Sequence, residues 1–145
     1  MLEEFQGREV LKGKDTSFGI FYPTGYIVAA LGSYEAAQRG KKTVLAAGYS
    51  EDEVEAVPGD YVIAEIEKGT KEAGLLTRVK QAISDAIGTE ASYWDDDLKL
   101  AKEGAGFLFI YCPTSREAER VQRMLKSENP RNMRRYARAA IEQLS

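Results

Sequence analysis

The stretch Tyr26-Ile27-Val28-Ala29-Ala30-Leu31, followed by Gly32-Ser33-Tyr34-Glu35-Ala36-Ala37, decides the fold. Six consecutive apolar residues put apolar side chains on both faces of a strand, which is typical of a central strand covered by helices. Ser33 is a preferred N-cap residue, and Glu35 places a negative charge in the first helical turn. The stretch therefore predicts a buried strand that leads directly into a helix.

A second strand and helix follow the same pattern later in the chain. The segment Phe107 to Cys112 is again apolar at every position, and Thr114 with Glu117 forms a capping box for a helix, with Ser115 as a rival cap. Both segments contain a glycine, six apolar residues, a hydroxyl cap and a Glu-Ala pair. They represent either an internal repeat or two β-α units that converged on one pattern.

The residues that follow the first unit predict a β-hairpin. Residues 53–57 alternate in polarity, Pro58-Gly59-Asp60 is typical of a turn, and Tyr61 to Ile66 resumes a strand pattern. Two β-α units with a hairpin between them predict an α+β fold. We expect a ferredoxin-like sandwich, with helices packed on one face of a mostly antiparallel sheet.

Three further helices are predicted from apolar spacing and caps. Leu75 to Ile87 has helical spacing, and Ser92 with Asp95 predicts the start of a helix that ends before Gly104. Asn129 followed by Pro130 is typical of the start of a last helix. These elements indicate a single domain over residues 1–145, with an irregular N-terminal arm (1–24), an α+β core (25–128) and a C-terminal helix (129–145).

The composition excludes several kinds of active site. The sequence has no histidine, which removes catalytic dyads and triads that depend on imidazole and most zinc and iron sites. No P-loop or dinucleotide-binding fingerprint is present, because Gly104-Ala105-Gly106 precedes a strand instead of opening a helix. We expect no catalytic residues, no metal and no cofactor.

The chain also has the features expected of a cytoplasmic protein. Cys112 is the only cysteine, so no disulfide can form within the chain. The first residues lack the basic start and apolar core of a signal peptide. The longest apolar runs, Tyr26 to Leu31 and Phe107 to Cys112, are far shorter than the roughly 20 residues that span a bilayer. We expect no membrane association.

Basic residues are concentrated near the C-terminus, although the net charge is −3. Within the predicted last helix, four arginines spaced i, i+3, i+4 and i+7 share one face and form an arginine stripe: Arg131, Arg134, Arg135 and Arg138. The preceding helix adds a second row: Arg116, Arg120, Arg123 and Lys126. These side chains either bind phosphate groups of nucleic acid, or form a solvated face that Glu119, Glu128 and Glu142 partly neutralise. In the second case, Arg138 and Glu142 form an i, i+4 pair.

Other reactive side chains have structural explanations. Asp95-Asp96-Asp97 resembles a set of hard metal ligands, but acids in the first turn of a helix are favoured by the helix dipole, and we expect capping. Cys112 is expected to be a buried structural thiol. The tyrosines around the first β-α unit and Trp94 either line a cleft or pack in the core and between subunits, and we expect packing.

Two parts of the sequence resemble the heat-induced general stress protein domain of bacteria. They are Gly25 to Ala37, and Ala101 to Ile110 followed by Ser115 to Val121. In that family a strand leads into a helix near a Glu-Ala pair, a glycine-containing turn like Ala47-Gly48-Tyr49 follows, and a second half repeats the theme after a Gly-x-Gly entry. The resemblance covers residues 25–125. It implies this topology and an association with stress responses, but no catalytic set.

The sequence therefore predicts a non-enzymatic domain that acts through self-association or a protein partner. We expect a homodimer that buries roughly 800 Å² per partner. Its surface would come from one side of the second apolar strand: Phe107, Phe109 and Tyr111, or Leu108, Ile110 and Cys112. The alternative is a nucleic-acid or phosphate-binding module that uses the arginine stripe. The third hypothesis is an enzyme that gathers carboxylates, tyrosines or lysines in a cleft.

Overall fold

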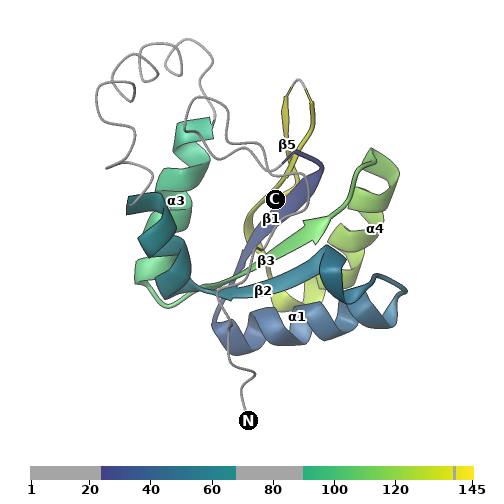
Figure 1. The fold of residues 1–145 in the computed structure, drawn as a ribbon, viewed down its shortest axis with the longest axis horizontal. Helices are drawn as coiled ribbons and strands as arrows, with labels where there is room; N and C mark the ends of the chain where they lie inside the picture. Colours follow the sequence, from purple (N-terminus) through teal and green to yellow (C-terminus); the bar gives the residue numbers. More distant parts are fainter. Residues whose placement is uncertain (1–23, 68–89, 139) are drawn as a thin grey trace.

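A computed structural model describes residues 24–67, 90–138 and 140–145 of the chain. Within these residues the elements follow one another as β1 (Tyr26–Leu31), α1 (Tyr34–Ala46), the 3₁₀ helix η2 (Glu51–Glu53), β2 (Val54–Pro58), a helical segment at 59–67, α3 (Glu90–Lys102), β3 (Gly106–Tyr111), α4 (Ser115–Leu125), the 3₁₀ helix η3 (Lys126–Glu128), β4 (Arg131–Tyr136) and β5 (Ile141–Gln143). Figure 1 shows their arrangement. The predicted arm at 1–24, apart from residue 24, and the predicted helix at 75–87 lie outside the described residues.

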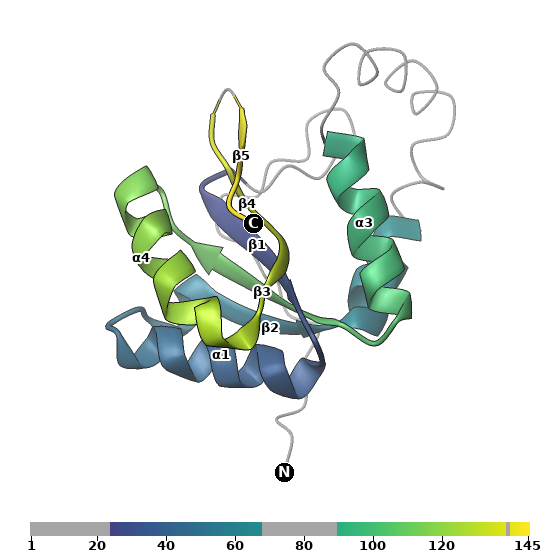
Figure 2. The same ribbon diagram turned by 180° about the vertical axis from the view of Figure 1, so that it is seen from behind.

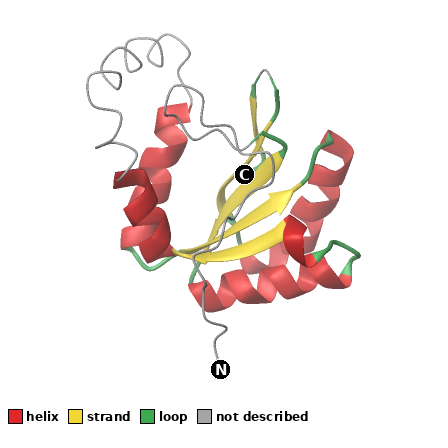
Figure 3. Ribbon diagram, in the orientation of Figure 1, coloured by secondary structure: helices red, strands yellow, loops and turns green. Residues whose placement is uncertain are grey.

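The described strands form one open antiparallel sheet in the order β2-β3-β1-β4-β5. The two apolar strands predicted from the sequence lie side by side at its centre, with Tyr26 opposite Tyr111 and Leu31 opposite Gly106. Each leads directly into a helix, as expected. The fold is α+β, with the helices arranged around this sheet (Figure 3).

One face of the sheet is covered by α1 and α4 (Figure 2). The inward side chains of β1 on this face, Ile27, Ala29 and Leu31, belong to one buried cluster. The helices contribute small and branched apolar residues to the same cluster: Ala36, Ala37, Val44, Ala118, Val121 and Leu125. The prediction that both β-α units pack on the same face is therefore confirmed.

The opposite face of the sheet is covered too, so the prediction of helices on one face only is wrong. Because side chains alternate along a strand, Phe107 and Phe109 point away from α1 and α4. They belong to a second cluster that includes Val62 from the 59–67 helix and Ala101 from α3. The chain between β2 and β3 thus supplies a second helical layer. Its α3 confirms the helix predicted to end before Gly104, whereas the helix at 59–67 was not predicted.

Two glycines allow α1 to lie close to the sheet. A Cβ atom on Gly40, inside α1, would lie 2.7 Å from Leu108 Cδ1. A Cβ atom on Gly106, at the start of β3, would lie 2.6 Å from the Ser33 carbonyl oxygen and from the Tyr34 Cα. The second contact is with backbone, which cannot rotate away as a side chain does. Gly106 is therefore required where β3 meets the start of α1.

The predicted strand at Tyr61 to Ile66 is wrong, because residues 59–67 are helical. Val62 and Ile66 are four residues apart, so this short apolar run fits a helical period as well as a strand period. Gly59 is buried, and a Cβ atom there would lie 2.4 Å from the Ala105 carbonyl oxygen. The missing side chain lets the helix begin against the end of α3.

The predicted C-terminal helix is also wrong, because residues 129–145 form β4 and β5 at the side of the sheet. Asn129 has a left-handed backbone (φ 51°), and this conformation turns the chain out of η3. Asn132 has φ 52°, in a register shift between β1 and β4. β4 pairs with β1, so these residues extend the same sheet.

Candidate interaction surface

Helix α4 presents a row of arginines because its cap and its apolar residues fix its orientation. The Thr114 side chain accepts a hydrogen bond from the Glu117 amide at 3.2 Å, which identifies Thr114 as the N-cap and excludes Ser115. Ala118, Val121 and Leu125 are buried against the sheet. The α4 arginine row, which consists of Arg116, Arg120 and Arg123, is therefore exposed on the outer side of the helix.

Helix α1 adds basic side chains to the same layer. Its residues Arg39 and Lys42 are exposed. The Arg39 guanidinium pairs with Glu128 at 3.1 Å and bridges α1 to η3. We name the exposed cations of this layer the basic surface: Arg39, Lys42, Arg116, Arg120, Arg123 and Lys126. The second row predicted from the sequence is thus part of a larger surface on two helices.

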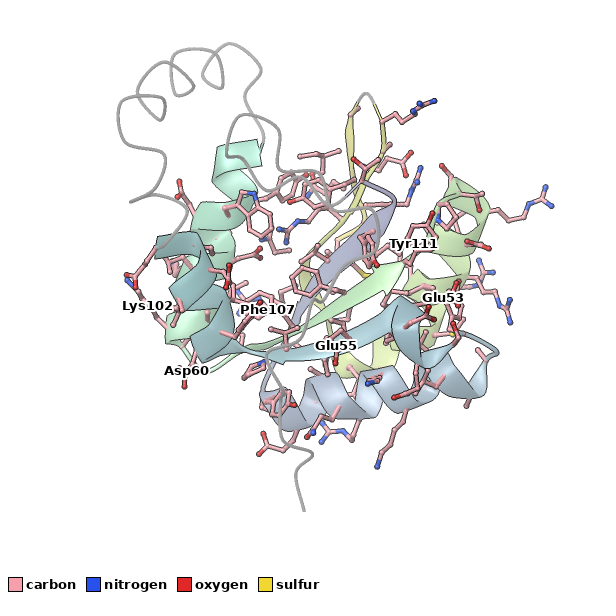
Figure 4. All side chains as sticks on the ribbon, viewed as in Figure 1. Glu53, Glu55, Asp60, Lys102, Phe107 and Tyr111 are labelled. Carbon is pink, nitrogen blue, oxygen red and sulfur yellow. The ribbon has the colours of Figure 1, made fainter. Side chains whose placement is uncertain are left out.

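A shallow hollow of about 240 Å³ lies beside the α4 arginine row. Its walls come from the residues after α1, from η2, from the end of β3 and from the first turns of α4. Its lining includes Tyr49, Glu53, Tyr111, Pro113, Glu117 and Arg120. The Arg120 guanidinium donates a hydrogen bond to the Ala47 carbonyl oxygen at 3.2 Å, which fixes it at the hollow. Arg120 therefore belongs both to the hollow and to the basic surface. Figure 4 shows Glu53 and Tyr111 on the side of the molecule where α4 lies.

Cys112 lies next to the hollow, and it is buried as predicted. Its thiol interacts with the Tyr49 side chain. Burial raises the pKa of Cys112 to about 11, and burial likewise raises the pKa of Tyr49 above its ordinary value. At neutral pH both groups are protonated, so neither is an activated nucleophile.

The arginine stripe predicted on a helix does not form. β4 carries Arg131, Arg134 and Arg135, whereas Arg138 lies between β4 and β5. Arg131 and Arg138 are exposed, but Arg134 is completely buried and only 6% of Arg135 is exposed. The structure therefore does not bring the four guanidinium groups together on one surface. Arg134 pairs with the buried Asp97, and Arg135 pairs with the partly exposed Glu142.

Arg134 is the centre of a buried cluster between β4 and α3. Its guanidinium binds Asp97 through two hydrogen bonds, at 2.9 and 2.6 Å, and neither side chain is exposed. Its Cζ atom lies 5.0 Å from the Trp94 ring, and the rings of Tyr93 and Tyr136 lie within 5.5 Å of it. Burial raises the pKa of Asp97, while Arg134 and Asn132 oppose that rise. This cluster joins the second helical layer to the sheet.

Arg135 forms a separate cluster on the opposite face of β4. It binds Glu142 at 2.8 Å and donates to the Ser115 hydroxyl and to the Pro113 carbonyl oxygen, both at 3.2 Å. This pairing holds the pKa of Glu142 below its ordinary value. The predicted i, i+4 pair of Arg138 with Glu142 is therefore wrong, because Glu142 faces Arg135 across the β4–β5 ladder.

The acidic triplet Asp95-Asp96-Asp97 does not cap α3, which begins five residues earlier at Glu90. Asp95 and Asp96 are exposed, whereas Asp97 is buried with Arg134. In the part of the chain that the structure describes, no group of histidine, cysteine, aspartate or glutamate side chains is arranged to hold a metal ion.

The dimer surface predicted on β3 is wrong in its location. Phe107, Leu108, Ile110 and Cys112 are completely buried within one chain, and only 6% of Phe109 is exposed. Tyr111, the remaining member of the predicted surface, is partly buried and lines the hollow. β3 lies inside the sheet, and helices cover both of its faces. Of the tyrosines around the first β-α unit, for which the sequence left a cleft open as an alternative to packing, Tyr49 lines the hollow and Tyr26 is buried in the core. The other residues of the hollow were not predicted, because they lie far apart in the sequence, between 47 and 120.

Comparisons with models of protein families, with curated proteins and with solved structures return no match to this chain. Among the described residues, no helix is long and apolar enough to cross a membrane.

Proposed function

We propose that this chain is a non-enzymatic α+β domain that acts by binding a protein with an acidic surface. The observation that carries the proposal is the α4 arginine row, which is exposed next to a hollow lined by Tyr49 and Tyr111. Arginine and tyrosine are enriched among the residues that dominate protein interfaces, and such residues cluster in and around pockets. Arg120 belongs to both features, so we expect it to lie near the centre of the interface.

The composition of the surface favours a protein over nucleic acid. Glu117 lines the hollow and Glu119 is exposed between the arginines of α4. Carboxylates at these positions repel a nucleic-acid backbone, which carries about one charge per 1.7 Å, more strongly than an acidic protein segment, whose residues are about 3.3–3.6 Å apart. Nucleic-acid or phosphate binding remains the second candidate, because Arg116, Arg120 and Arg123 lie on one side of one helix.

Binding to charged probes separates these two candidates. At low salt we expect a fluorescent polyglutamate peptide to bind more tightly than a mixed-sequence oligonucleotide of equal charge. Each exposed ion pair contributes about 0.2–1 kcal/mol, so replacing all three arginines of the α4 row with glutamate should weaken peptide binding roughly tenfold or more.

A control of equal charge change shows whether the effect is local. Replacing Lys99, Lys102 and Arg131 with glutamate removes three exposed cations that lie outside the basic surface. With both triple variants compared at about 0.1 M salt, where the Debye length is about 10 Å, we expect this control to bind the peptide within about threefold of the original protein, because charges outside the basic surface are then largely screened. Equal losses in the two triple variants would show that only net charge matters and would refute the proposed site. Tighter oligonucleotide binding with a steep salt dependence would favour the second candidate.

We also propose that the core is ferredoxin-like and related to the stress protein domain. Two features support this. β1, α1, β2, β3, α4 and β4 follow the β-α-β-β-α-β order, with strands arranged 4-1-3-2 when they are counted in that order. The segments that resemble the stress domain lie on β1 with α1 and on β3 with α4. An increase in the protein's abundance after heat exposure of its source cells would support the stress association, and an unchanged abundance would oppose it.

A further inference from the structure

The two helical layers carry opposite charge. The basic surface on α1, α4 and η3 has six exposed cations, and the exposed acids of these elements and of the adjoining η2 are Glu35, Glu51, Asp52 and Glu119. The layer of α3 and the 59–67 helix has the reverse composition, because its exposed cations are Lys99 and Lys102. We name its six exposed acids the acidic surface: Asp60, Glu65, Glu67, Asp95, Asp96 and Glu103.

These two surfaces face away from each other. α1 and α4 pack on the β1 side chains Ile27 and Leu31, whereas α3 and the 59–67 helix pack on the other face of the sheet. In Figure 4, Asp60 and Lys102 lie beside α3, far from the side where α4 lies. Over the described ranges 24–67, 90–138 and 140–145, the exposed charge is mainly positive on one side of the sheet and mainly negative on the other.

We propose that the partner of the basic surface is the acidic surface of a second copy of this chain. The inference rests on the proposed function, since it names the protein that the α4 arginine row binds. Complementary charge favours encounter in this orientation, and it opposes contact of two basic or two acidic layers. Among the described residues, exposed cations outnumber exposed acids on the first surface, and exposed acids outnumber exposed cations on the second.

The geometry determines the kind of assembly. A symmetric dimer uses the same patch on both copies, but here the two complementary patches lie on opposite faces. One contact therefore leaves a basic surface free at one end and an acidic surface free at the other. Further copies add head to tail, which gives rings or open chains whose average mass rises with concentration. Because the paired charges are exposed, added salt screens the contact.

Two charge-reversed variants test this arrangement. The first replaces Arg116, Arg120 and Arg123 with glutamate, so both of its layers are acidic. The second replaces Glu65, Asp95 and Asp96 with lysine, so both of its layers are basic. We expect the original protein to show concentration-dependent mass growth in sedimentation velocity at low salt, lost at about 0.5 M salt. Each variant alone should stay monomeric, and an equimolar mixture should regain the assembly.

The outcomes separate this inference from the proposed function. A strictly monomeric original protein that still binds the polyglutamate peptide would overturn self-association and leave the proposed function standing. Mass growth that persists in both variants would overturn the charged contact. Failure of the peptide binding and of the mixture together would overturn both. A double variant, Arg116→Glu with Arg123→Glu, keeps the hydrogen bond from Arg120 to the Ala47 carbonyl oxygen. We expect it to lose assembly as the triple variant does, while its urea unfolding midpoint stays that of the original protein.

Discussion

Replacing Asp97 with asparagine tests the buried cluster that joins α3 to the sheet. Asparagine has nearly the shape of aspartate, so the substitution removes the charge and leaves the packing in place. Arg134 is then a buried cation without its counter-charge, since both side chains are completely buried in the original protein. The remaining partners of the guanidinium are the Asn132 carbonyl oxygen and the Tyr136 hydroxyl.

We expect Asp97→Asn to lower the free energy of unfolding by a large part of the total stability of a domain. Removing one partner of a buried ion pair typically costs about 3–5 kcal/mol, because the other charge stays in a medium of low polarity. The free energy of unfolding of most domains is only about 5–15 kcal/mol. With a urea dependence of roughly 2 kcal/mol per molar, the unfolding midpoint should fall by about 2 M.

Trp94 makes this experiment selective. It is the only tryptophan, its ring stacks on Tyr136 at 6.1 Å, and it lies 5.0 Å from the Arg134 Cζ atom. Its fluorescence therefore reports directly on the cluster during urea unfolding. Asp95→Asn is the matched control, since Asp95 is exposed on the same helix, and we expect it to change the stability by less than about 0.5 kcal/mol.

Two outcomes decide the matter. If Asp97→Asn is no more destabilising than the control, the ion pair contributes nothing and the account of the cluster is wrong. If both partners are replaced with leucine, the loss should be smaller than for Asp97→Asn, because no charge remains buried.

Three further predictions concern other parts of the core. Gly106→Ala should lower the stability by about 1–3 kcal/mol through its backbone clash, whereas Gly32→Ala, which meets nothing within 4 Å, should change it little in the same urea assay. Cys112 should resist iodoacetamide at about pH 8 in the native protein, because its raised pKa keeps the thiol protonated, and react once urea unfolds the chain; rapid native labelling would contradict its burial. Arg135 lowers the pKa of Glu142, so this pair stabilises the protein above the ordinary value of 4.5 and the contribution disappears as the pH falls through the lowered pKa. Glu142→Gln should flatten the fall in stability below about pH 4.5, and an unchanged acid profile would exclude the pairing.

The sequence predicted the two central strands because a strand that is apolar at every position must be buried on both of its faces. Six apolar residues in each of two segments need cover on both faces, and Ser33 and Thr114 identify where the following helices begin. Short or ambiguous segments were less predictable. Val62 and Ile66 fit both a helical period and a strand period. Residues 59–67 form a helix whose first residue, Gly59, packs against the end of α3, and the local sequence does not show this contact.

The C-terminal arginines show why spacing alone was insufficient. Their i, i+3, i+4 pattern fits a helix, but Arg134 finds its partner Asp97 on an element 37 residues away. No local pattern identifies a pair at that distance, and the ion pair together with the β1–β4 ladder outweighs helix propensity. The α4 row was predictable because the Thr114 N-cap and buried apolar residues fix the orientation of that helix.

Mapping the amide shifts of the isotope-labelled protein during titration with polyglutamate tests the central claim most directly. We predict that the largest changes fall on residues 115–126 of α4 and η3 and on residues 39–43 of α1, which carry the basic surface. Changes confined to α3 and residues 59–67, or no change at low salt, would contradict the claim that this protein binds its partner through that surface.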